Sequence, residues 1–160
     1  MRRARSSLTT ERARSHLNRL DLPTLTMSTA GKDQEVPQQI ADRLEKVAGG
    51  QATIAQVVGL SRDQLYKIAD KAYQLFSQGR LDEAKQIYQG LVAADPYDSV
   101  FHCHFGAVLW RAGELDRAFE EYDAAVRYNF ANVDALGGRG ELLISRGDVE
   151  KGIEDLSAAL

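Results

Sequence analysis

Three glycines recur at an interval of 34 residues, and this period constrains the fold more than any other feature of the sequence. Gly79, Gly113 and Gly147 lie in the similar segments SQGRLDEA, RAGELDRA and SRGDVEKG. Four further columns hold residues of the same kind in all three copies: Ala72, Gly106 and Gly140; Leu81, Leu115 and Val149; Ala84, Ala118 and Gly152; and Tyr88, Tyr122 and Leu156. Such self-similarity is typical of a repeat protein whose units pack one on the next.

The repeated segments favour helix over strand. Residues 38–95 and 97–160 contain no proline and are rich in Ala, Leu, Glu, Gln, Lys and Arg, which are good helix formers. A glycine in the left-handed conformation ends a helix at no steric cost, so each glycine of the 34-residue series is expected to end the first helix of a pair. The small residues seven positions before and five positions after it would let the two helices of a pair approach closely.

This spacing resembles the tetratricopeptide repeat, a helix hairpin that stacks into a solenoid. We therefore predict an all-α tetratricopeptide-repeat solenoid of three hairpins with an N-terminal helical extension. The predicted parts are a disordered basic tail and linker (1–37), a helical segment (38–60) and the repeat domain (61–160), with repeats at about 65–98, 99–132 and 133–160. The third repeat lacks its closing turn, so either the chain is truncated after Leu160 or a partner covers that end.

The segment before the repeats carries two helix signals. Ile40, Leu44 and Val47 lie on one face of a helix over 38–47, and Thr53–Val58 can form another short turn. Ser61 followed by Gln64 is typical of a capping box that opens the first repeat helix. Helices this short need a packing partner, either the first repeat or a second subunit.

Charge is divided unevenly along the 160-residue chain, whose formal net charge is −3. Residues 1–26 hold six Arg against Glu11 and Asp21, whereas the remainder is acidic. An acidic body repels phosphate, so we expect no nucleic-acid partner. A basic start with no apolar stretch fits neither a Sec nor a twin-arginine signal, which leaves a mitochondrial presequence, a disordered tail, or upstream sequence preceding a true start at Met27.

The sequence has neither a long apolar run nor a pair of cysteines, and both absences bear on the cellular compartment. No apolar run approaches the roughly 18 residues of a membrane span, so we expect no membrane insertion. The single cysteine, Cys103, excludes a disulfide framework and favours a reducing compartment. We expect a cytoplasmic protein.

No group of residues predicts catalysis. His102 and His104 flank Cys103, but two residues on a helix are about 200° apart and cannot face one metal ion. Gly31-Lys32-Asp33 lacks the remainder of a phosphate-binding loop, and the glycines at 137–140 follow no strand. We expect no metal, no cofactor and no enzymatic activity.

One arc of the first helix of each repeat is a candidate binding surface, since this arc faces the groove in tetratricopeptide solenoids. The predicted groove residues are Tyr66, Ala69, Tyr73, Phe76, Val100, Cys103, Ala107, Trp110, Arg111, Glu141 and Ile144. Their aromatic members either line an apolar trough for an extended peptide or are buried by neighbouring helices. Small residues such as Ala69 and Ala107 would leave hollows that receive the side chains of the peptide.

The first repeat junction and its lead-in resemble a particular family. Asp95, Tyr97, Asp98 and Ser99, followed by an aromatic residue and Gly106, and the Gly49-Gly50 pair before a short helix, are similar to the class II chaperones of bacterial type III secretion. The resemblance covers residues 45–160. Asn132 and Val133 stand where the family usually has a proline, which leaves the specific client open.

The resemblance implies a non-enzymatic chaperone that binds an extended segment of a translocator or effector protein in its groove before export. The alternative is a generic tetratricopeptide scaffold without a secretion role. The family also implies a homodimer formed through the N-terminal helices. The predicted dimerisation residues are Ile40, Leu44, Val47, Ile54, Val57 and Val58.

Overall fold

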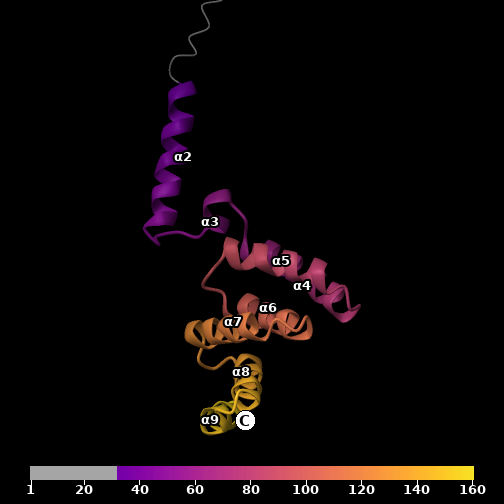
Figure 1. Ribbon diagram of the computed structural model, residues 1–160. Coiled ribbons are helices and arrows are strands. Elements are labelled where there is room, and N and C mark those ends of the chain that lie inside the picture. The colour runs from indigo at the N-terminus through magenta and orange to yellow at the C-terminus, as the bar shows by residue number, and fades with distance from the viewer. Residues whose placement is uncertain (1–31) are drawn as a thin grey trace, which may run out of the picture. The chain divides into compact units, whose positions relative to one another are not determined.

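The computed structural model describes residues 32–160, and every regular element in that range is a helix. The helices are α2 (Lys32–Ala48), α3 (Ile54–Val58), α4 (Arg62–Ser77), α5 (Leu81–Ala94), α6 (Ser99–Arg111), α7 (Leu115–Tyr128), α8 (Val133–Ser145) and α9 (Val149–Ala158). Figure 1 shows them in chain order, with α4–α5, α6–α7 and α8–α9 as consecutive pairs. The predicted all-α solenoid of three hairpins is confirmed.

The chain divides into two units at Gln39–Ile40. The described part of the first unit is the beginning of α2. The second unit, residues 40–160, contains the end of α2, α3 and the three hairpins. The first 31 residues, which hold most of the predicted basic tail, lie outside the described range.

The glycines of the 34-residue series end the first helix of each hairpin, as predicted. Gly79, Gly113 and Gly147 have φ angles of 79°, 81° and 89°, which places all three in the left-handed region. The amide N–H of each glycine donates to a carbonyl of the preceding turn, for example Gly79 to Phe76 at 3.0 Å. Each hairpin turn is therefore specified locally by one residue that has no Cβ.

The small-residue columns lie where the two helices of a hairpin meet. Ala72 and Ala84 in the first repeat are fully buried. In the third repeat, a Cβ on Gly140 would lie 2.9 Å from the Gly152 carbonyl oxygen, and a Cβ on Gly152 would lie 2.8 Å from the Gly140 oxygen. Contacts this short leave no room for a side chain, so the close helix approach in the third hairpin requires glycine at both positions.

The N-terminal extension differs from the prediction at its start. α2 begins at Lys32 and not at Gln38, so the linker predicted to reach residue 37 already contains helix. Pro37 led to the wrong boundary: a proline near the start of a helix removes one backbone hydrogen bond without necessarily ending the helix.

Both α3 and α4 begin with a capping box. In the predicted capping box of α4, the Ser61 amide donates to the Gln64 side chain at 2.8 Å, and the Gln64 amide donates to the Ser61 hydroxyl at 3.3 Å. Thr53 and Gln56 form the same reciprocal pair at the start of α3. These caps satisfy amide groups that a helix start leaves without partners.

The core runs between consecutive helices along the repeats. Its largest fully buried side chains are Tyr88, Phe101, Val108, Leu109 and Leu142. Because α6 contacts α4, α5, α7 and α8, it is the central helix of the array.

Polar junctions join successive hairpins. Asp98 is the N-cap of α6 and accepts hydrogen bonds from the Val100 amide (2.9 Å) and the Tyr66 hydroxyl (3.0 Å). At the next junction Asn132, the N-cap of α8, donates to the Ser99 hydroxyl at 2.7 Å. The junction residues that carry the family resemblance therefore cap helices and connect repeats. Asn132, like Asp98, accepts a hydrogen bond from a backbone amide of the helix that it caps, the amide of Ala135 at 3.0 Å.

Candidate functional site

The first helices of the three repeats form one continuous surface. α6 contacts α4 on one side and α8 on the other, so predicted groove residues from all three repeats lie on adjoining helices. We call the exposed and half-buried members of that set the first-helix surface: Tyr66, Tyr73, Phe76, Val100, Ala107, Trp110, Arg111, Glu141 and Ile144. Whether this surface binds a peptide stays a prediction.

An apolar hollow lies on this surface between the first and second repeats. It has a volume of about 30 Å³, and its lining includes Tyr73, Phe76 and Ala107 from the predicted groove. The other two lining residues are Tyr88 and His104, which the sequence analysis did not assign to the surface. Tyr73 keeps 53% of its surface exposed, whereas Phe76 and Ala107 are half-buried and pack on the core. The small residue at position 107 therefore borders a hollow, as expected.

The polar atoms of the hollow form a short chain of contacts. The Tyr88 hydroxyl lies 3.0 Å from His104 Nδ1 and donates to the Ala69 carbonyl oxygen at 3.2 Å. Burial lowers the pKa of His104 below its ordinary value, against the opposing effect of nearby carboxylates, and burial raises the pKa of the Tyr88 hydroxyl. His104 is therefore a neutral imidazole at neutral pH, and Tyr88 keeps its proton.

Phe76 and Trp110 of the predicted groove contact neighbouring side chains. The Arg111 guanidinium lies 4.8 Å from the centre of the Phe76 ring and donates to the Phe76 carbonyl at 3.3 Å. Trp110 packs edge to face against Tyr122 with the ring centres 6.3 Å apart. Both aromatic side chains are half-buried, so they pack against the core and also contribute to the surface.

Two residues of the predicted groove lie in the core. Ala69 and Cys103 are 5% and 4% exposed. Burial raises the pKa of the Cys103 thiol to about 12. These two side chains of the predicted arc pack in the core between helices and are not part of the exposed surface.

The third repeat contributes less apolar area to the first-helix surface. Glu141 is exposed and Ile144 keeps 37% exposure. Ile144 lies against the backbone at Gly152, where an added Cβ would be 2.5 Å from the Ile144 side chain. The strongest apolar feature of the surface therefore belongs to the first two repeats.

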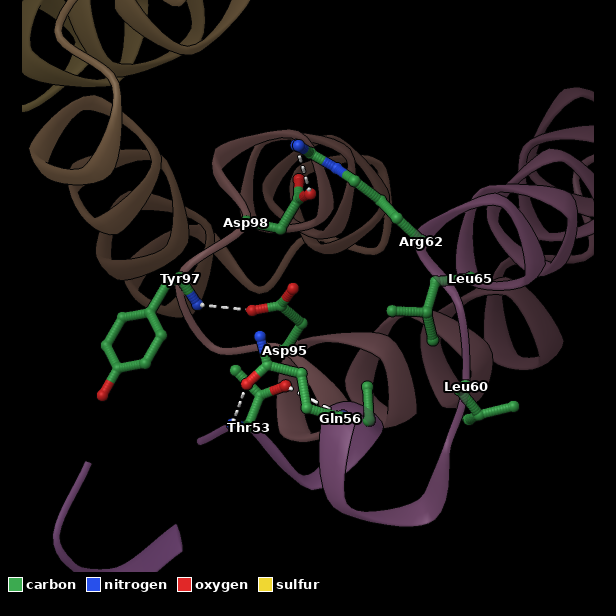
Figure 2. A pocket seen from close by; sticks show the side chains of 9 residues that line it. Thr53, Gln56, Leu60, Arg62, Leu65, Asp95, Tyr97 and Asp98 are labelled. Carbon is green, nitrogen blue, oxygen red and sulfur yellow. Dashed lines mark hydrogen bonds and ion pairs between the residues drawn. The ribbon is translucent and has the colours of Figure 1, made fainter. Parts of the chain in front are cut away.

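A second and larger pocket lies beside the first repeat junction (Figure 2). Its volume is about 370 Å³, and it is lined by Thr53, Ala55, Gln56, Leu60, Arg62, Leu65, Asp95, Tyr97 and Asp98. Figure 2 shows the Arg62 guanidinium paired with Asp98, a contact of 3.2 Å, while the Asp95 carboxylate accepts from the Tyr97 amide at 3.4 Å. Sequence reasoning missed this pocket because its lining comes from two stretches that lie far apart in the chain, 53–65 and 95–98.

The predicted dimerisation residues lie on α2 and α3, and most of them are exposed. Ile40, Leu44, Ile54 and Val58 keep 51%, 62%, 46% and 61% of their surfaces exposed. Val47 and Val57 are half-buried. These apolar side chains therefore stay partly or largely exposed within the second unit.

The described part of the chain holds neither a cluster of metal-ligating side chains nor a membrane-spanning helix. Between residues 32 and 160, no three His, Cys, Asp or Glu side chains are grouped so as to hold a metal ion. None of the helices in this part of the chain combines the length and apolar character needed to cross a membrane.

The family profile of the tetratricopeptide repeat matches residues 105–160. Low calcium response locus protein H of Yersinia pestis is 28% identical over 106 residues, which cover 62% of this chain and 63% of that protein. The translocator chaperone SycD of Yersinia enterocolitica has a similar fold: the TM-score is 0.62 at 25% identity, over 68% of this chain and 81% of SycD. This chain is similar to a type III secretion translocator chaperone.

A further structure of SycD has a similar fold. SycD in complex with a peptide of the translocator YopD matches 62% of this chain and 76% of SycD, with a TM-score of 0.57 and 24% identity. These chaperone relatives share the helical repeats described above. The chain spans less than two thirds of the length of the curated relative from Yersinia pestis.

Proposed function

We propose that this protein is a non-enzymatic secretion chaperone. It binds an extended segment of a translocator or effector protein on the first-helix surface and keeps that client soluble in the bacterial cytoplasm before export. The observation that carries the proposal is the apolar hollow lined by Tyr73, Phe76 and Ala107, because it lies on helices of two consecutive repeats. The YopD peptide complex of the related SycD supports the same kind of client.

The binding free energy expected for such a surface is suited to reversible binding of a client. A fully buried apolar side chain contributes roughly 1.5–3 kcal/mol, so a client segment that buries two or three such side chains along the first-helix surface gains that amount from each. Ordering an extended segment offsets part of this gain. We expect an affinity in the micromolar range, which permits release of the client for export.

The exposed apolar residues of α2 and α3 support a second part of the proposal. Leu44 and Val58 each leave more than half of their surface exposed. Because apolar patches of this kind are commonly covered by a partner, we include a homodimer formed through α2 and α3.

The test is capture of the client by matched variants of the full chain. Ala107→Glu places a charge at the hollow, whereas Ala93→Glu makes the same change at an exposed position of α5 that does not line the hollow. Each variant is tagged and isolated from the native host, and the retained proteins are identified by mass spectrometry. We expect the wild type and Ala93→Glu to retain a protein with paired apolar membrane segments, and Ala107→Glu to lose it with unchanged helicity.

Trp110→Ala separates the two interpretations of the aromatic residues. Loss of a binding anchor weakens client affinity by about 1–3 kcal/mol in a fold that remains intact. If the variant unfolds and no binding-specific effect remains, Trp110 belongs to the core. Retention of the same client by Ala107→Glu would contradict the proposed surface, and retention of non-secreted proteins alone would favour the generic scaffold.

A further inference from the structure

His104 is the polar side chain of a hollow that is otherwise aromatic and apolar. Its ring lies 5.8 Å from that of Tyr73 and meets that of Tyr88 edge to face at 5.7 Å. Phe76 and Ala107 complete the lining. A polar atom in such a place restricts which ligands the hollow accepts. Binding is weakened when a ligand covers a hydrogen-bonding group without pairing with it.

The contacts of Tyr88 identify the tautomer of His104. The Tyr88 hydroxyl has a single hydrogen, and its two neighbours are the Ala69 carbonyl oxygen and His104 Nδ1. A carbonyl oxygen only accepts, so both contacts are hydrogen bonds when the hydroxyl donates to Ala69 and His104 Nδ1–H donates to the hydroxyl. In a neutral imidazole the proton on Nδ1 leaves Nε2 without one. Nε2 of His104 is then a hydrogen-bond acceptor.

This acceptor is available to a ligand. Among the described residues no hydrogen bond to His104 Nε2 is formed, and no buried side-chain nitrogen or oxygen lacks a partner. Nε2 is therefore in contact with solvent, on a side chain that lines the hollow.

We infer that His104 determines specificity at this hollow and that the hollow takes a threonine or serine side chain of the bound segment, whose hydroxyl donates to Nε2. The inference rests on the proposed function. It goes beyond that function by naming the class of side chain that the hollow selects.

The size of the hollow favours a small side chain. Its volume is only about 30 Å³, which leaves little room for a long or aromatic side chain. A threonine brings one methyl group, which packs against Phe76 and Ala107, and one hydroxyl, which reaches His104. Valine has the same shape as threonine but no donor, so it covers Nε2 without satisfying it.

Protonation of His104 removes the acceptor. Its surroundings hold the Tyr73 and Tyr88 rings, and the carboxylates of Asp70, Asp98 and Asp134 act on it from α4, the α6 N-cap and α8. Burial outweighs these carboxylates and keeps the pKa of His104 below its ordinary value. The preference for threonine should therefore be present at neutral pH and disappear under acid conditions that leave the helices folded.

The experiment is a selection of peptides on the full chain. A phage-displayed library of random 12-residue peptides is selected on immobilised wild-type protein and on Ala107→Glu, which serves as the control for the site. The best peptide is then synthesised with threonine or valine at its most restricted position, and both affinities are measured at neutral and acid pH. We expect threonine or serine at that position and about 3- to 10-fold tighter binding of the threonine peptide at neutral pH.

His104→Phe should abolish this preference while the valine peptide still binds. Tyr88→Phe keeps His104 but removes the hydroxyl that contacts its Nδ1, so the preference for threonine over valine should weaken. If His104→Phe fails to fold, Tyr88→Phe and the pH series test the role of His104 instead. The inference would be overturned if the selected peptides show no position restricted to threonine or serine, or if His104→Phe keeps the same preference for threonine. Either result would leave the proposed function unaffected. If the wild type selects no peptide that Ala107→Glu loses, the proposed function itself fails, and the inference fails with it.

Discussion

His102 Nδ1 lies 2.7 Å from a carboxylate oxygen of Glu121, which connects the two helices of the second repeat. His102 Nε2 lies 3.0 Å from the Pro96 carbonyl oxygen. Both neighbours only accept hydrogen bonds, so both ring nitrogens make their contacts when His102 is protonated. Burial alone would lower the pKa of His102, but the hydrogen bonds to Glu121 and Pro96 outweigh it and raise the pKa above its ordinary value.

This raised pKa predicts a pH-dependent contribution to stability. A histidine whose pKa is higher in the folded state stabilises the fold fully below its unfolded pKa of about 6.5, and the contribution is lost as the pH rises through the folded value. The measurement is urea unfolding by circular dichroism across that range, for wild type and Glu121→Gln. We expect the free energy difference between them to shrink as the pH rises, and a difference independent of pH would contradict the ion pair.

Arg139 joins the second and third repeats through two carboxylates. It contacts Asp155 with two hydrogen bonds of 2.7 and 2.8 Å and Asp123 with one of 2.8 Å. Only 20% of the Arg139 side chain and 12% of the Asp155 side chain are exposed. Arg139→Met should lower the free energy of unfolding by about 3 kcal/mol, because it leaves a nearly buried carboxylate unpaired.

The matched control for Arg139 is Lys151→Met. Lys151 pairs with Asp148 at 2.7 Å, but 68% of its side chain is exposed. Removing an exposed pair costs less than about 1 kcal/mol. Equal effects of the two substitutions in urea unfolding would refute the structural role of Arg139.

Two adjacent glycines of α8 should respond in opposite ways to alanine. A Cβ at position 138 would lie 2.7 Å from two ring carbons of Tyr122, which is buried, so Gly138→Ala should destabilise the fold by about 1–3 kcal/mol. At position 137 nothing lies within 4 Å of an added Cβ. Gly137→Ala should stabilise it by about 0.5–1 kcal/mol, since alanine is the better helix former. Thermal unfolding of both variants checks the pair, and a stabilising Gly138→Ala would contradict the packing around Tyr122.

The dimer is tested by charge on the exposed faces of α2 and α3. The double variant Leu44→Asp, Val58→Asp replaces two exposed apolar side chains, which should convert a dimer into a monomer without loss of helicity. Gln89→Asp, at an exposed position of α5, is the control and should stay dimeric. Light scattering coupled to gel filtration distinguishes the two states. A wild-type chain that is monomeric at high micromolar concentration would refute the dimer.

Local features of this fold were predictable because their causes lie within a few residues. The left-handed glycines at 79, 113 and 147 and the capping box of Ser61 and Gln64 depend on backbone conformation and short-range hydrogen bonds. The 34-residue spacing repeats these signals, which is why the three hairpins could be derived. The start of α2 at Lys32 could not be derived, because Pro37 weakens a helix without necessarily ending it.

What the sequence alone determined was therefore the repeat architecture and the direction in which the predicted groove residues point around each first helix. Tertiary structure decided which of these residues remain accessible. Cys103 lies in the core, while His104, the next residue, lines the hollow and contacts Tyr88 from the preceding repeat. Periodicity gives a side chain's direction around its own helix, but burial depends on how closely the neighbouring helices approach, and α6 has neighbours from all three repeats.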